Sequence, residues 1–150
     1  MSTSEIISAL VAVFGLPASL WFYFKLRYDS KQKEKEILQK TRQELDSNSS
    51  LQNIVQTLEA ERLHNSVPQE PVQLDLRRLP AFLEDVASNW EFKTVSTKAA
   101  YDVIGEIVIW CDESKILWEG ESPPRDETHW RLFNKFAAAI RSEKLRRDET

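Results

Sequence analysis

The chain contains little cysteine, histidine and glycine, and each shortage excludes a class of protein. Among its 150 residues Cys111 is the one cysteine, so the chain cannot form an internal disulfide framework. Two widely separated histidines give no metal-ligand spacing. Three glycines are too few to suggest phosphate-binding loops or many tight β-hairpins. We therefore expect a mainly α protein in a reducing compartment, without a metal or a cofactor.

Charged residues are absent from one long stretch near the N-terminus. Residues 6–24 contain no Asp, Glu, Lys or Arg. As a helix with a rise of about 1.5 Å per residue, this stretch covers about 28 Å, close to the ~30 Å hydrocarbon core of a bilayer. A buried helix of a globular domain is not normally apolar on every face over such a length. The sequence predicts one transmembrane anchor within residues 1–28.

The residues on either side of this stretch predict its orientation. Glu5 is the one charge before it, whereas Lys and Arg are frequent in residues 25–35. Basic residues beside a span stay on the cytoplasmic side, so we expect a single-pass protein of the cell membrane with its N-terminus outside and its C-terminus in the cytoplasm. A cleaved signal peptide needs a basic segment before the apolar core, and none is present. We expect the following side chains at the membrane interface: Trp21, Tyr23, Lys25, Arg27 and Tyr28.

Residues 29–64 form a polar connector that is rich in helix-forming residues. Leu38 and Leu45 are seven positions apart, as are Leu51 and Leu58, but the two pairs do not share one register. Between them, residues 46–50 favour caps and turns over helix interiors. We expect two helices, over about 29–45 and 51–64, which are either hinged at residues 46–50 or run on as one strained helix. They form either a short coiled coil, which gives weak homo-oligomers, or solvated helices that lie against the C-terminal domain.

Two prolines mark a boundary after the connector. Pro68 and Pro71 favour extended backbone, which indicates a linker over residues 65–73. Residues 74–146 then predict a small helical bundle, with helices over about 76–90 and 97–112 and a short helical turn over 114–118. Ser96 is a suitable N-cap for the second helix. Ser122 and Pro123 predict the start of a last helix that ends near Leu145.

The charged and reactive residues give no sign of catalysis. Cys111 falls on a mostly apolar helix, which is typical of a small core residue. His129 has no second or third ligand nearby in the sequence, and adjacent acids such as Glu84 and Asp85 point to different sides of a helix. The net charge is −4, and residues 70–127 hold most of the acidic excess. This acidity disfavours nucleic acid as a partner. We expect a protein that is not an enzyme.

One loop of the C-terminal domain is a candidate partner-docking site. Trp118 and Trp130 flank it, and Arg125 lies within it. Aromatic and arginine side chains are common anchors of protein interfaces. Packing of both indoles in the core is the favoured alternative.

Three segments carry a resemblance to known proteins: residues 79–84 (LPAFLE), 99–105 (AAYDVIG) and 107–110 (IVIW). With these segments the chain resembles a loose group of uncharacterised bacterial single-pass membrane proteins that have a C-terminal helical domain. The resemblance implies an anchored, all-helical domain and assigns no functional residue. The chain is also similar to phage inner-membrane lysis subunits, which have one N-terminal span and a helical stem. Those proteins place the stem in the periplasm, which the basic residues after the span argue against.

Two functions agree with these expectations. The first is a membrane-anchored interaction module, such as a scaffold, regulator or accessory subunit, with a lipid bilayer and a protein at the cytoplasmic face as its partners. The alternative is a membrane-acting effector of lysis, toxicity or phage exclusion, in which the span itself is the active element.

Overall fold

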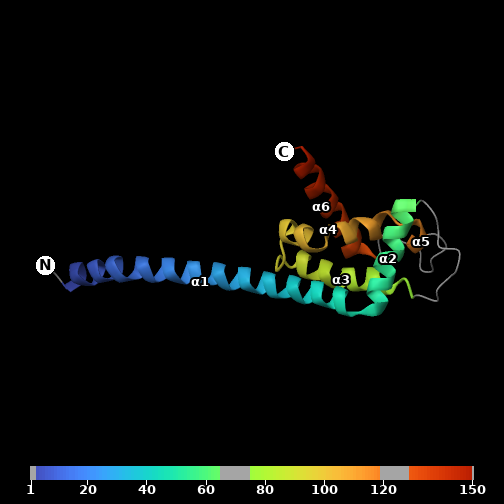
Figure 1. Ribbon diagram of the computed structural model, residues 1–150. Helices are drawn as coiled ribbons and strands as arrows, with labels where there is room; N and C mark the ends of the chain where they lie inside the picture. Colours follow the sequence, from blue (N-terminus) through green and yellow to red (C-terminus); the bar gives the residue numbers. More distant parts are fainter. Residues whose placement is uncertain (1–2, 65–74, 119–128, 150) are drawn as a thin grey trace.

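The computed structural model describes residues 3–64, 75–118 and 129–149, and it describes side chains from residue 19 to residue 63 and in the two later segments. These residues form six α-helices and no strand (Figure 1). The mainly α prediction is therefore confirmed. The helices are α1 (Thr3–Ser47), α2 (Ser49–His64), α3 (Arg78–Glu91), α4 (Thr97–Glu113), α5 (Lys115–Trp118) and α6 (Arg131–Asp148).

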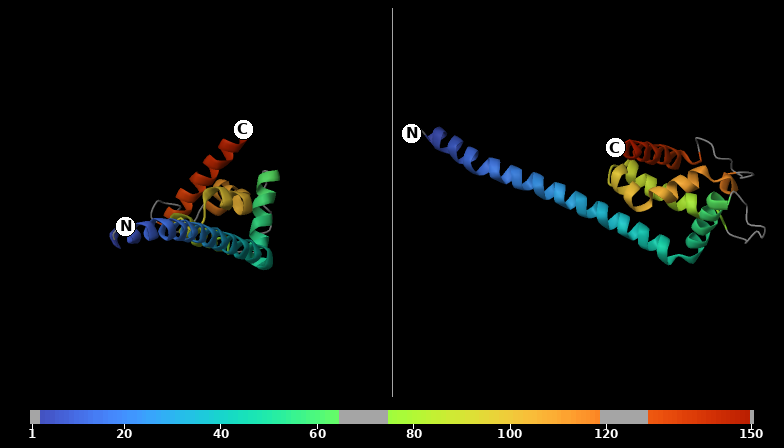
Figure 2. Two further views of the ribbon diagram at one scale, coloured as in Figure 1. Left: turned by 90° about the vertical axis from the view of Figure 1, so that its left-hand side faces the viewer. Right: turned by 45° about the horizontal axis from the view of Figure 1, so that its top comes forward.

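The longest element is α1, which extends far beyond the other helices. It has 45 residues, which at 1.5 Å per residue is about 67 Å. Its C-terminal part lies along the bundle, whereas its N-terminal half projects away from it (Figures 1 and 2). The first buried side chain of α1 in the described part is Leu38. The helix predicted over residues 29–45 is thus continuous with the helix that contains the charge-free stretch.

A sharp change of direction separates α1 from α2 at Asn48. The Asn48 side-chain oxygen accepts hydrogen bonds from the backbone N–H groups of Ser50, at 3.1 Å, and Leu51, at 3.3 Å. This is N-cap geometry, which satisfies donors that the first turn of a helix leaves free. The predicted break within residues 46–50 is confirmed. The connector forms two helices that run in different directions, and it is not one continuous helix.

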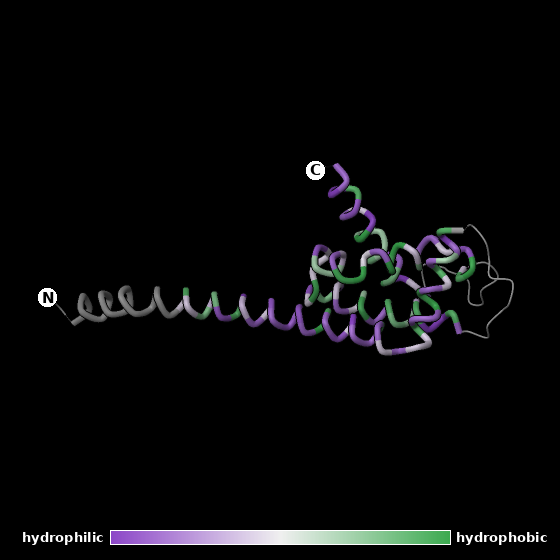
Figure 3. The backbone as a smooth tube through the Cα atoms, viewed as in Figure 1, coloured by the Kyte–Doolittle hydropathy of each residue, from purple (hydrophilic) through white to green (hydrophobic). Residues whose placement is uncertain are grey.

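The hydrophobic core is shared by the connector and the C-terminal helices. Leu38 and Leu45 of α1 are buried together with Leu51, Ile54 and Leu58 of α2. They belong to one cluster with the apolar faces of the later helices, whose largest buried members include Phe133 and Phe136 of α6. Figure 3 shows the hydrophobic residues gathered inside the bundle. Of the two alternatives for the connector, the structure has its helices lying against the domain.

Three glutamates stabilise this arrangement by accepting hydrogen bonds at the start of a helix distant in sequence. Glu34 of α1 accepts from the backbone N–H of Ser96, at 2.6 Å, where α4 begins. Glu61 of α2 accepts from two backbone N–H groups at the start of α5, and Glu84 of α3 accepts from two backbone N–H groups at the start of α6. A carboxylate at a helix N-terminus satisfies free N–H donors and interacts favourably with the helix dipole. Two of the three contacts join the connector to the C-terminal helices.

The helix boundaries of the C-terminal domain agree with prediction except at α6. Ser96 is the N-cap of α4, and its hydroxyl accepts from the Ala99 N–H at 3.3 Å, as expected. The predicted start at Ser122 and Pro123 lies outside the described residues, but a helix continuous through Trp130 is wrong because α6 begins at Arg131. Trp130 makes no side-chain cap. The start is fixed instead by Glu84, which accepts from the backbone N–H of Leu132 at 3.2 Å and from that of Phe133.

Candidate functional site: an aromatic and basic collar on α1

The projecting half of α1 carries a band of exposed aromatic and aliphatic side chains, residues 20–28, which we call the α1 collar. Its large hydrophobic members are each more than half exposed: Leu20, Trp21, Phe22, Tyr23, Phe24, Leu26 and Tyr28. Successive residues of an α-helix lie about 100° apart, so these side chains surround the helix. Figure 3 shows hydrophobic residues alternating with hydrophilic ones where the coloured part of α1 begins, outside the bundle. No other described element covers this segment.

The contacts within the collar are local to α1. The Lys25 ammonium lies 5.2 Å from the centre of the Trp21 ring, a cation–π distance. The rings of Tyr23 and Phe24 meet edge to face, with centroids 5.8 Å apart. The amide of Gln32 donates to the Tyr28 hydroxyl at 2.7 Å. The aromatic side chains of the collar are therefore more than half exposed, and the Tyr28 hydroxyl has a polar partner on the same helix. Exposed Trp and Tyr side chains beside basic residues are typical of a membrane–water interface.

The backbone of the predicted span belongs to α1, and the structure describes side chains of α1 from residue 19 on. Within the described part of the chain, no helix combines the length and the apolar character needed to cross a membrane. The side chains of residues 6–18, which make up most of the predicted span, lie outside that part. What the structure adds is the position of the collar, at the end of the charge-free stretch and on the unpacked half of α1.

The two tryptophans of the predicted docking site contact each other. The rings of Trp118 and Trp130 are 5.8 Å apart in an edge-to-face pair, and Trp118 also lies 6.0 Å from Phe133. The Trp118 indole N–H donates to the Cys111 carbonyl at 2.7 Å. Both indoles are half-buried against the core. Arg125 lies outside the described residues, so a docking role for the three residues stays a prediction.

Of the other reactive side chains, Cys111 and Asp112 are buried and His129 is exposed. Cys111 is fully buried. The Asp112 carboxylate is 2 % exposed and forms an ion pair with Arg141 at 2.9 Å. The described segments contain no group of His, Cys, Asp and Glu that could hold a metal ion. A cleft beside Trp110 and Arg62 has a volume of about 190 Å³, which is smaller than the ~300 Å³ at which pockets for drug-sized ligands begin.

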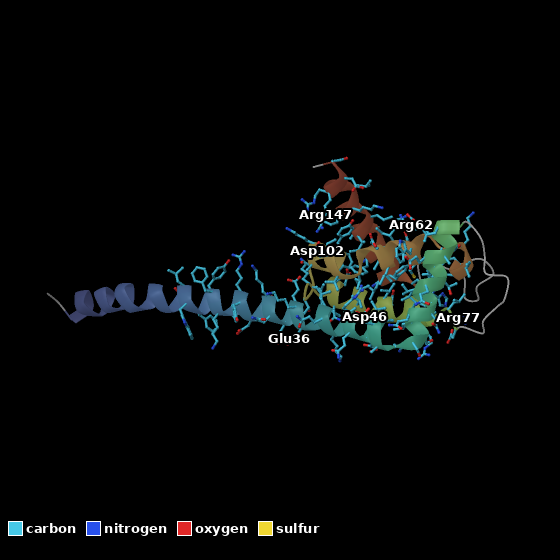
Figure 4. The ribbon with its side chains drawn as sticks, viewed as in Figure 1. Glu36, Asp46, Arg62, Arg77, Asp102 and Arg147 are labelled. Atoms are coloured by element: carbon cyan, nitrogen blue, oxygen red, sulfur yellow. The ribbon has the colours of Figure 1, made fainter. Side chains whose placement is uncertain are left out.

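Sequence reasoning missed an ion cluster between α4 and α6. The Arg147 guanidinium donates to Asp102 at 2.6 Å and to Glu143 at 2.9 Å, and it lies 4.5 Å from the centre of the Tyr101 ring. Figure 4 shows Arg147 beside Asp102. Hydrogen bonds from Arg146 and then Arg147 lower the pKa of Glu143 from 4.5 to about 2. The spacing of Glu143 and Arg147 indicates a helical pair, but no local signal reports the contact with α4.

Comparison of the chain with protein-family models, with curated proteins and with solved structures found no match. The assignment of a function therefore depends on the geometry of the collar and the bundle.

Proposed function

We propose that this protein is a non-enzymatic interaction module, anchored in the cell membrane by a single N-terminal span, with its helical bundle on the cytoplasmic side. The observation that carries the proposal is the exposed α1 collar beside the charge-free stretch. Burial of a large apolar side chain stabilises by about 1.5–3 kcal/mol. A bilayer interface buries such side chains on every face of a helix, and the basic residues that follow reach anionic headgroups.

The way α1 joins the bundle supports a presenting role. Leu38 and Leu45 belong to the bundle core, and Glu34 caps the start of α4. The anchor and the bundle are thus connected by one continuous helix. A protein partner that binds the bundle is held at a defined height and orientation relative to the bilayer, which is what a scaffold, regulator or accessory subunit requires.

Alkaline carbonate extraction of membranes tests the anchor. We expect the full chain to stay in the membrane pellet, and a variant with both Leu10→Arg and Val13→Arg to be released. Each arginine near the centre of a span costs about 2.5–3.5 kcal/mol of insertion free energy. The matched control places the same two arginines on exposed positions of α2, Asn53→Arg with Gln56→Arg, and should remain in the pellet. Release of the unmodified chain by carbonate would contradict the proposal.

A second experiment separates the module from a membrane-acting effector. Residues 1–36 contain the span and the collar but lack the buried part of α1. Their expression alone should leave the membrane potential unchanged if the span is an anchor. Depolarised or dying cells would assign the activity to the span and overturn the interaction module.

A further inference from the structure

The turn between α3 and α4, residues 92–96, exposes an aromatic side chain next to a basic one. Phe92 is 79 % exposed, more than any other large hydrophobic side chain of the described residues, and Lys93 follows it. We propose that this turn is a second membrane contact, which lies against the headgroups of anionic lipids beside the point where α1 leaves the bilayer. This inference rests on the proposed function, because it requires α1 to be the anchor.

The fold holds the turn on the side of the bundle that faces the collar. In both Figure 1 and Figure 2 it lies at the end of the bundle nearest the projecting half of α1. A groove of about 650 Å³ runs between the two and is lined by Leu26 and Lys33 of α1 and by Lys93 and Thr94 of the turn. The hydrogen bond from the Ser96 N–H to Glu34 fixes the turn at this level of α1.

The depth of the turn follows from the rise of the helix. Phe24 ends the charge-free stretch. Two residues of α1 that line the groove lie beyond it along the helix axis, Leu26 by about 3 Å and Glu36 by about 18 Å. The headgroup layer of one leaflet is about 5–8 Å thick. The Leu26 side of the groove therefore lies at headgroup depth, whereas Glu34, which holds the turn, lies about 15 Å beyond Phe24. A tilt of about 20° toward this side, the average for spanning helices, brings a turn ~10 Å from the axis about 3 Å closer, to about 12 Å. The contact is therefore made by the exposed side chains of Phe92 and Lys93 and not by the backbone of the turn.

The backbone of the turn presents Lys93 at a position where glycine is the more stable residue. Lys93 has a φ of 57°, and it is the one non-glycine residue with positive φ among those described. Its N–H donates to the Trp90 carbonyl at 2.9 Å, and the Thr94 N–H donates to the Asn89 carbonyl at 3.0 Å, which closes the end of α3. Glycine makes such a turn without a steric penalty. Lysine adds a cation beside Phe92 instead.

The charges around the turn favour an anionic surface. Lys93 and Lys98 are exposed. The nearby acids are engaged: Glu34 accepts from Ser96, and Glu91 forms an ion pair with Lys135 at 3.3 Å. Asp29 and Glu36 line the α1 side of the groove, where Lys33 accompanies them. An aromatic ring with flanking lysines is the side-chain combination that enters the interface of anionic membranes.

Spin labels on the full chain in lipid nanodiscs test the contact. Cys111 is fully buried, so a cysteine introduced at an exposed position takes the label. Phe92→Cys reports the turn, and Trp21→Cys reports the anchor. The matched control is Leu63→Cys, at a 70 % exposed residue near the C-terminal end of α2, a helix that Figure 1 shows at the other end of the bundle. The measurement is the collision rate of each label with a water-soluble nickel complex, in discs that contain phosphatidylserine and in discs of phosphatidylcholine alone.

We expect the label at position 92 to be shielded from nickel in the phosphatidylserine discs and the label at position 63 to stay accessible. Adding Lys93→Gly should weaken the contact about fivefold, because one lysine near an anionic surface contributes roughly that factor. The same substitution should raise the thermal stability of the protein. Equal accessibility at positions 92 and 63, with position 21 shielded, would overturn the second contact and leave the anchor intact. Accessibility at all three positions would overturn the proposed function as well.

Discussion

Replacement of Glu61 by alanine should detach the connector from the end of α4 and lower the stability of the whole bundle. The Glu61 carboxylate accepts from the Ser114 hydroxyl at 2.6 Å and from the backbone N–H groups of Lys115, at 2.8 Å, and Ile116, at 3.2 Å. A hydrogen bond to a charged group contributes about 1.5–3 kcal/mol, and loss of a helix cap costs about 0.5–2 kcal/mol. Because water reaches part of this site and replaces some of the lost bonds, we expect a loss of about 2 kcal/mol.

The loss is measurable by thermal unfolding of the full chain in detergent, followed by near-ultraviolet circular dichroism. For a folded unit of this size, 2 kcal/mol corresponds to a fall in Tm of about 5–12 °C. Glu59→Ala is the matched control, since Glu59 lies exposed on the same helix, and its effect should stay within about 0.5 kcal/mol. Equal stabilities of the two variants would refute the view that a carboxylate from the connector holds the start of α5.

Two further predictions concern the connector and the ion cluster. Leu45→Ala should cost about 2–5 kcal/mol in urea unfolding because Leu45 is 3 % exposed in the shared core, whereas Leu26→Ala, at an exposed position of the same helix, should cost less than about 0.5 kcal/mol. The pKa of Glu143 is about 2 instead of 4.5 in the folded protein, chiefly through Arg146 and then Arg147. Its stabilising contribution is therefore complete above about pH 4.5 and is lost as the pH falls toward 2. Unfolding measured at several pH values over this range should show a smaller loss of stability per pH unit in Arg147→Met than in the unmodified protein. An equal loss in the two proteins would contradict the role of Arg147 in lowering the pKa of Glu143.

Local sequence patterns predicted most of the helices because their signals lie within a few residues. The seven-residue spacing of the connector leucines and the polar residues 46–50 gave two helices and the break at Asn48. Ser96 was identified as an N-cap from its own side chain, which bonds three residues ahead. The aromatic and basic residues of the collar were likewise visible in the sequence, and the structure adds that no described element covers them.

Contacts between distant residues were not predictable in the same way. The start of α6 at Arg131 involves Glu84, a residue 48 positions from Leu132, and no local signal reports that contact. The spacing of the connector leucines is compatible with a coiled coil to a second chain and equally with packing against the bundle of the same chain. Only the three-dimensional arrangement decides between those partners. The proximity of the 92–96 turn to α1 has the same non-local origin.

The orientation of the protein in its membrane is the most direct test of the account. A reporter that is active only in the cytoplasm, fused after Thr150, should be active in the full chain, and a reporter active only outside the membrane should be silent at the same position. This result is expected because basic residues follow the charge-free stretch and the collar, which lies at the same end, is proposed to be at the cytoplasmic interface. Activity of the outside reporter after Thr150 would contradict it, since the bundle would then face away from the partners proposed for it.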